Sequence, residues 1–160
     1  MNVRTGLLLL VCISLLNCKS KNANKNFESI QQDFSFTKEG ELYLIKATGD
    51  TIQKLDIEFA RDEYERETGL MHREQMEANQ GMLFIFEEEA QRGFFMKNTL
   101  IPLDLIYIDS KQKIVSFAEN AQPLDETTLP SQVPAQYVLE INAGLSEEWG
   151  LDIGDSVSWK

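Results

Sequence analysis

The chain has 160 residues, with 15 basic and 26 acidic side chains and a formal net charge of −11. Its length suits one domain, and its composition is that of an ordinary globular protein, since 42% of the residues are hydrophobic and 26% are charged. The acidic balance argues against nucleic acid as a partner, because phosphates attract clustered Lys and Arg. With one His and two Cys, the chain has few side chains that could build a zinc site.

The first residues are typical of a targeting segment. Arg4 gives a positive start, and residues 6–16, GLLLLVCISLL, form an apolar run without charge. This length suits a secretory signal, whose apolar region spans roughly 7–15 residues, and it is too short for a membrane span of about 20 residues. We therefore expect residues 1–17 to be a signal peptide.

The end of this run, Leu15-Leu16-Asn17-Cys18, resembles the lipobox of bacterial lipoproteins, in which the Cys is lipidated and becomes the new N-terminus. Asn17 departs from the Gly or Ala that usually precedes this Cys, and the alternative is a cleaved signal without lipidation. The lipidated form predicts a protein anchored through Cys18 to a bacterial membrane, in the cell envelope. Cys12 would leave with the signal, so the mature domain would have no free thiol.

Residues 18–38 are expected to be the lipidated Cys and a flexible tether, and residues 39–160 the folded domain. The stretch 19–32, KSKNANKNFESIQQ, is polar and has no apolar period. Residues 19–56 hold six basic and six acidic side chains, whereas residues 57–160 hold eight basic and twenty acidic ones. The acidity therefore belongs to the folded domain.

The first part of the domain predicts a hairpin followed by a helix. Residues 42–47 and 52–59 are rich in β-branched and apolar side chains and flank a turn-like Thr-Gly-Asp triplet. Residues 62–68 predict a helix of about two turns. Asp62 can cap this helix together with Glu65 in a capping box, and a glycine follows where a helix can end.

The rest of the domain predicts mainly strands. The apolar run GMLFIF at 81–86 is typical of a strand buried on both faces, and a charged turn follows at 87–93. Segment 120–134 contains three prolines and predicts a long surface loop. Further strands are expected at 94–98, 103–109, 113–119, 136–142 and 153–159, with one short helical turn within 144–150.

These elements predict an α+β fold that is mostly β. We expect a small single-domain barrel or sandwich of about seven short antiparallel strands, with one or two short helices. A closed sheet would remove the exposed edges that an open sheet presents.

Several short blocks occur in a fixed order along the domain. They are GLMHR at 69–73, GMLFIF at 81–86, MKNT at 96–99, PLD at 102–104, and VLE at 138–140 with AG at 143–144. Together they resemble the DUF192 (UPF0127) family of small bacterial and archaeal proteins, over residues 52–158. Phe95 stands where this family usually has Trp, which keeps an aromatic side chain. The resemblance implies a domain that is often exported or lipid-anchored, and it implies no established activity.

Asp104 is the most unusual polar residue of the sequence. It lies in the otherwise apolar segment LDLIYI and, by period-two alternation, shares a face with Ile106 and Ile108. A buried carboxylate must be paired or hydrogen-bonded, because burying it alone is costly. In one interpretation, Asp104 accepts backbone N–H groups of the adjoining turn, or an Arg, and fixes the fold.

In the other interpretation, Asp104 converges with Arg73, Lys97 and Asn98 on a ligand. Arg73 would bind a carboxylate or phosphate in a bidentate way, and Asp104 would accept a hydrogen bond from a hydroxyl or an amine. This arrangement requires a concave pocket into which Asp104 and at least one of the other three side chains project.

The sequence contains no motif of a known catalytic site. We find no G-x-S-x-G elbow, P-loop, dinucleotide fingerprint or H-E-x-x-H. We expect no metal and no cofactor, and we assign no catalytic residue. Our hypothesis is a lipid-anchored, non-catalytic binding or accessory domain for a small ligand or an envelope partner. The alternatives are a small-substrate hydrolase that uses Asp104 with Arg73 and Lys97, and a structural member of an envelope assembly.

Overall fold

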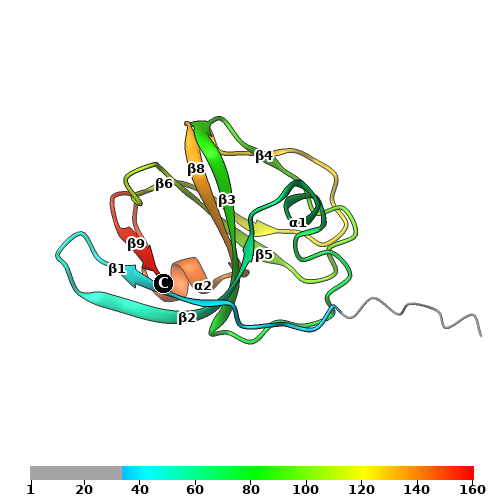
Figure 1. Cartoon of the computed structure of the whole chain (residues 1–160), viewed down its shortest axis with the longest axis horizontal. Coiled ribbons are helices and arrows are strands. Elements are labelled where there is room, and N and C mark those ends of the chain that lie inside the picture. Colours follow the sequence, from blue (N-terminus) through cyan, green and yellow to red (C-terminus); the bar gives the residue numbers. More distant parts are fainter. Residues whose placement is uncertain (1–33) are drawn as a thin grey trace, which may run out of the picture. The chain divides into compact units, whose positions relative to one another are not determined.

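The computed structural model describes residues 34–160, which form nine strands and two short helices (Figure 1). The expected signal peptide, Cys18 and most of the expected tether lie outside the described residues. Neither helix of the described part has the length and apolar character that crossing a membrane requires.

The elements follow one another along the chain in this order: β1 Gly40–Ile45, β2 Thr51–Ala60, α1 Glu63–Thr68, β3 Gln80–Ala90, β4 Gly93–Phe94, β5 Leu103–Ile108, β6 Ile114–Ala121, β7 Leu129–Pro130, β8 Ala135–Asn142, α2 Leu145–Glu148 and β9 Ser156–Trp159.

The predicted hairpin and the capped helix are confirmed. Strands β1 and β2 pair in antiparallel fashion on either side of the tight connection at 46–50. At the start of α1, the Asp62 carboxylate accepts from the Glu65 N–H at 2.8 Å, and the Glu65 carboxylate accepts from the Asp62 N–H at 3.0 Å. Both halves of the capping box are therefore present.

Two elements differ from the prediction. The expected turn at 87–93 is largely strand, because β3 continues to Ala90. The expected strand at 94–98 is wrong, since only Gly93 and Phe94 pair with another strand, the short β7. Asn98 adopts a left-handed backbone with φ of 56°, which ends any extended segment. The side chain of Met96 is buried in a hydrophobic core, and the Met96 backbone is not part of a strand.

The main sheet has seven strands in the order β6-β5-β8-β3-β2-β1-β9. Strands β2 and β3 are parallel, which corrects the prediction of an all-antiparallel sheet. Their parallel pairing requires the connection through α1 and residues 69–79 to return the chain to the end of the sheet where β2 began.

The sheet curls without closing into a barrel. Strands β6 and β9 are its two edges, and one isolated bridge between Lys113 and Ser156 joins them. Near this bridge, the Ile114 N–H donates to the Asp155 carbonyl at 2.9 Å. The prediction of a mostly β domain is confirmed, whereas a closed barrel is not found, and a curled open sheet describes the fold.

Two hydrophobic cores lie on opposite faces of the central strands. The first, here called the α2-side core, includes Leu145 of α2, and the second, the α1-side core, includes Leu70 just after α1. Buried side chains of the α2-side core include Leu42, Leu55, Ile57, Leu83, Ile106, Leu139, Ile141 and Val157. Those of the α1-side core include Met82, Phe84, Met96, Leu105, Tyr107 and Val138.

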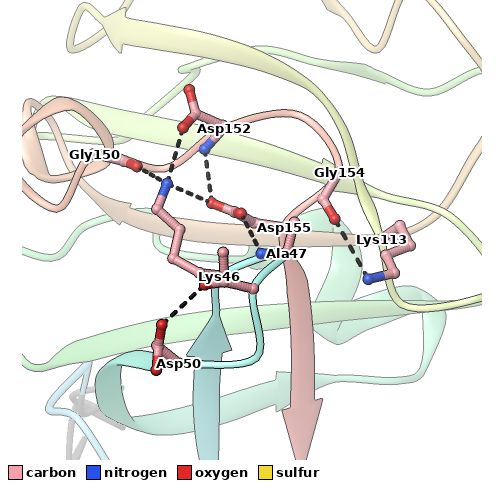
Figure 2. A network of polar contacts seen from close by, with 9 residues as sticks. Lys46, Ala47, Asp50, Lys113, Gly150, Asp152, Gly154 and Asp155 are labelled. Carbon is pink, nitrogen blue, oxygen red and sulfur yellow. Dashed lines mark hydrogen bonds and ion pairs between the residues drawn. The ribbon is translucent and has the colours of Figure 1, made fainter.

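A polar network joins the end of β1 to the segment before β9, and Figure 2 shows its arrangement. The Lys46 ammonium contacts the carboxylates of Asp152 at 2.9 Å and Asp155 at 3.0 Å, and it also donates to the Gly150 carbonyl. Asp155 is buried and accepts from the Ala47 N–H at 2.9 Å. Burial raises the pKa of Asp155, but the N–H groups of Asp152 and Ala47 and the Lys46 charge outweigh it and lower this pKa below its ordinary value. The network fixes the corner where the curled sheet nearly closes.

Candidate functional site

Asp104 is completely buried on β5, where it faces the α2-side core. One of its oxygens accepts from the Asn120 N–H at 2.8 Å. The other accepts from the N–H groups of Gly144 at 2.9 Å and Ser146 at 3.0 Å, and from the Ser146 hydroxyl at 2.6 Å. Asp104 therefore holds the start of α2 against the sheet, mainly through backbone N–H groups of β6, of Gly144 and of α2 itself.

Arg73 lies on the other side of the sheet, in a buried ion pair with Glu58 of β2. The Nη2–Oε2 distance is 2.7 Å, and both side chains are at most one-tenth exposed. Glu58 and Ala60 alternate with Ile57 and Phe59 of the α2-side core, so Glu58 points to the α1 side. The second Glu58 oxygen accepts from the Thr37 N–H at 2.9 Å.

Lys97 and Asn98 occupy the exposed turn after Met96. The Asn98 amide lies 3.9 Å from the Met71 sulfur, and the Asn98 carbonyl accepts from the His72 N–H at 2.8 Å. Asp104 and Arg73 thus have different partners on different faces of the sheet. The structure does not bring these two together, and Lys97 and Asn98 belong to surface loops.

A cavity of about 350 Å³ lies on the α1 side, between α1, the segment after it and strands β3 and β4. Aromatic rings form much of its wall: Phe84 and Phe94 meet edge to face at 5.1 Å between ring centres, and Phe86 and Phe94 do so at 6.4 Å. Its size falls within the range of small-molecule pockets. The lining residues are Glu63, Arg66, Glu67, Thr68, Gly69, Leu70, Met71, Phe84, Phe86, Gly93, Phe94, Phe95, Thr99 and Glu140.

Glu140 is the buried charged group of this cavity. It lies on β8, opposite Met82 of β3 and Leu105 of β5, and only 6% of its surface is exposed. Within residues 34–160 we find no hydrogen bond to its carboxyl group. Burial raises the pKa of Glu140 to about 8, from an ordinary value of 4.5. At neutral pH this carboxyl is therefore mostly protonated and can donate as well as accept a hydrogen bond.

Tyr107 is a polar neighbour of Glu140, and its hydroxyl already has another hydrogen-bond partner. The Tyr107 hydroxyl donates to the Leu129 carbonyl at 2.7 Å. Burial, and then the Glu140 charge, raise the pKa of Tyr107, so its phenol stays neutral. Burial alone accounts for the raised pKa of Glu140, and among residues 34–160 we find no cation paired with its carboxyl group.

The mouth of the cavity carries charges from α1. Glu63 and Glu67 line it and are exposed, and Arg66 lies between them in sequence. The Arg66 guanidinium donates to the Arg61 carbonyl and to the Ile85 carbonyl, the latter at 3.3 Å, so backbone oxygens occupy part of its donor set. Phe95 also lines the mouth, and half of its surface is exposed.

A second cavity, of about 470 Å³, lies near α2 and has a more polar lining. Its acidic side chains are Glu119, Glu147 and Asp152. Among residues 34–160, no group of three or more His, Cys, Asp or Glu side chains has a geometry that could hold a metal ion. The α1-side cavity is therefore the stronger candidate site.

The sequence analysis did not select Glu140, although the signal was present. Glu140 belongs to the VLE block and lies in the strand segment YVLEIN, where alternation puts it on one face with the apolar Val138. The same argument that singled out Asp104 applies to it. What alternation could not reveal is that Asp104 meets N–H groups of β6, Gly144 and α2, whereas Glu140 meets a cavity.

The fold and the cavity define a small, mostly β domain with a buried carboxyl that has no partner within residues 34–160 and lies in an aromatic pocket. The family model of DUF192, described as an uncharacterized ACR, matches residues 44–159. The chain therefore belongs to the DUF192 family, as the sequence blocks predicted.

Two solved structures are similar to this chain. One is a proposed transcription regulator from Sinorhizobium meliloti 1021, at 40% identity and a TM-score of 0.73, with 78% of this chain and 97% of that chain covered. The other is a protein of unknown function from Novosphingobium aromaticivorans DSM 12444, at 36% identity and a TM-score of 0.70, with 74% and 84% covered. The comparison with curated proteins gave no match.

Proposed function

We propose that the protein is a lipid-anchored, non-catalytic binding domain of the cell envelope whose α1-side cavity takes a small apolar molecule. The observation that carries the binding role is the Glu140 carboxyl, which is buried at an aromatic cavity without a partner among the described residues. Leaving a buried polar group unsatisfied costs roughly 1–3 kcal/mol, and a ligand that hydrogen-bonds to it would recover this cost.

The composition of the cavity favours binding over catalysis. Its lining contains aromatic, aliphatic and glycine residues, Thr68 and Thr99, one buried carboxyl and the charged groups of α1, and none of its described lining residues is Ser, Cys, His or Lys. A Ser–His, Cys–His or Ser–Lys pair therefore has no candidate among these side chains. The hydrolase alternative gains no support from Asp104 either, because four hydrogen bonds from the chain already occupy its oxygens.

The lipid anchor is a separate part of the proposal and has its own test. Its support is the sequence at Cys18 and the charge and apolar pattern before it. In a bacterial host, the wild-type protein should incorporate radiolabelled palmitate and sediment with membranes. Label that persisted in Cys18→Ala would contradict lipidation at this residue, whatever the cavity binds.

A transcriptional role, which the description of the Sinorhizobium relative suggests, is opposed by the charge of this chain. Residues 57–160 carry twenty acidic and eight basic side chains. A DNA-binding surface requires clustered positive charge to displace counterions from phosphates. We therefore do not extend that role to this protein.

The binding role can be tested with neutral apolar probes. Indole, 2-naphthol and 1-decanol would each be titrated to millimolar concentration while amide shifts are followed by NMR. We expect at least one probe to give saturable shifts centred on Phe84, Phe94 and Glu140. Met71→Trp, which fills the cavity at its lining, should abolish them, whereas Ile153→Trp, at an exposed position outside the cavity lining, should not. Shifts that do not saturate, or that survive Met71→Trp, would contradict the proposal.

A further inference from the structure

We propose that the α1-side cavity selects ligands that carry a protonated amine on an aromatic or apolar body. This inference rests on the proposed binding function and names the chemical class of the ligand. Three parts of the cavity support it: the buried carboxyl, the aromatic wall and the charged mouth.

The Glu140 carboxyl is the first part. It is buried and, among the described residues, has no ion-pair or hydrogen-bond partner. An ammonium group that entered the cavity could donate to its oxygens in a charge-assisted hydrogen bond, which is roughly twice as strong as a neutral one. A neutral hydroxyl would make only the weaker bond. A carboxylate ligand would instead keep Glu140 protonated and would bring its negative charge to a cavity that Glu63 and Glu67 also line.

The aromatic wall is the second part. Phe84, Phe86 and Phe94 line the cavity, and aromatic rings attract cations over their faces. The Phe86 centroid lies 3.9 Å from the Arg92 guanidinium carbon and 5.4 Å from that of Arg66, so protein cations already use this ring. Phe84 and Phe94 are therefore the rings that suit a ligand cation with an apolar body.

The charged mouth is the third part. Glu63 and Glu67 line it together with Arg66, and the backbone carbonyls of Arg61 and Ile85 already accept from the Arg66 guanidinium. The two carboxylates outnumber this one cation, so the local charge favours a positive ligand. The nearest other acid of the same sheet row is Glu58, which is paired with Arg73 and does not change this balance.

Binding should also release a proton, and this gives the inference a specific readout. Because burial raises the pKa of Glu140 to about 8, its carboxyl is mostly protonated at pH 7. An ammonium ligand keeps its own proton and stabilises the carboxylate, so Glu140 transfers its proton to the buffer. Close to one proton should leave per ligand bound, whereas a neutral ligand should release none.

The experiment is calorimetric titration with three molecules that share an indole body: tryptamine, the neutral tryptophol and the anionic indole-3-acetate. Each is titrated into the full-length protein at pH 7 in phosphate and in Tris, since the dependence of the measured heat on buffer counts the protons released. We expect tryptamine to bind at least tenfold more tightly than the other two and to release close to one proton.

Variants assign the effect to Glu140. Glu140→Gln should abolish proton release and lower tryptamine affinity at least tenfold, while tryptophol affinity changes little. Glu148→Gln, an exposed acid on α2 outside the cavity lining, should change neither. The proton count of the wild-type protein tests the inference even if Glu140→Gln does not fold.

The outcomes separate this inference from the function on which it rests. Tryptophol or indole-3-acetate binding as tightly as tryptamine, or tryptamine binding without proton release, would overturn the amine preference and leave the binding role intact. If none of the three binds at millimolar concentration, the amine preference is wrong. The binding role is wrong with it only if the neutral probes described above also fail.

Discussion

Asp104 and Glu140 are two buried acids on neighbouring strands, and they differ in what surrounds them. Asp104, on the α2 side of β5, accepts four hydrogen bonds from three residues of the domain. Glu140, on the α1 side of β8, accepts none from the described residues and lines a cavity. N–H and O–H groups of the domain satisfy Asp104, whereas Glu140 is left available to another molecule. Unsatisfied hydrogen-bonding capacity, more than burial or charge, therefore distinguishes the site from the scaffold.

The largest expected effect is at Asp104. Asp104→Ala would remove the acceptor of three backbone N–H groups and leave the Ser146 hydroxyl with Glu119 as its acceptor, so we expect a loss of about 5 kcal/mol in the free energy of unfolding. Urea denaturation followed by circular dichroism measures it. Asp104→Asn keeps one acceptor oxygen and should lose less. A loss below about 1 kcal/mol would show that Asp104 does not hold α2 in place.

Glu58 is a third buried acid, and its ion pair is with Arg73. Arg73→Met would leave Glu58 buried and unpaired, and we expect it to destabilise the domain by about 4 kcal/mol. Adding Glu58→Leu removes the unpaired charge and should recover most of that loss. If the double variant were as unstable as Arg73→Met, loss of packing rather than loss of the ion pair would be the cause.

Asp104 and Arg73 stabilise the folded protein, whereas the Glu140 carboxyl should destabilise it when ionised. Its effect on the free energy of unfolding should therefore depend on pH. Its pKa is raised from 4.5 to about 8 in the folded protein, so the folded state keeps the proton more firmly than the unfolded state. Stability linked to this proton is fully present below about pH 4.5 and is lost as pH rises through 8. Relative to Glu140→Gln, wild type should lose on the order of 3 kcal/mol between pH 4.5 and 7. Parallel pH profiles of the two proteins would contradict the buried, unpartnered state of this acid.

Lys46 should give the smallest of these effects. Lys46→Met removes the cation from Asp155, but the N–H groups of Ala47 and Asp152 still donate to that carboxylate, each at 2.9 Å. We expect the urea midpoint to fall by less than half the shift seen for Asp104→Ala. An equal or larger fall would mean that the corner shown in Figure 2 contributes more to stability than the turn around Asp104.

The sequence predicted features that depend on neighbouring residues. The Asp62–Glu65 capping box, the β1–β2 hairpin and the face of Asp104 follow from short-range spacing, and the structure has all three. The interpretation in which backbone N–H groups satisfy Asp104 agrees with the structure in the kind of donor, but the donors lie on β6, at Gly144 and in α2 rather than in the adjoining turn. The DUF192 assignment rested on ordered blocks, and the family model matches the same region.

The features that the sequence did not predict depend on distant parts of the chain. The parallel pairing of β2 and β3 and the incomplete closure of the sheet are set by how long connections run, which local patterns do not encode. The same is true of Arg73, which lies in the connection after α1 and whose partner Glu58 lies on β2. Residues 94–98 have the composition of a strand, but only Phe94 pairs with another strand, and the Met96 side chain is buried in the α1-side core.

The pairing of the first strand with the last one has a consequence for how the domain folds. Strand β1 lies between β2 and β9, and Leu42 faces Trp159 next to the C-terminal residue. Contacts between such distant segments form slowly, because a long loop must close before they contribute. The α2-side core contains side chains from β1 and β9, so it cannot be completed before β9 is available. A chain emerging from the ribosome would thus stay open until β9 has emerged, and removal of β9 should prevent folding rather than only weaken it.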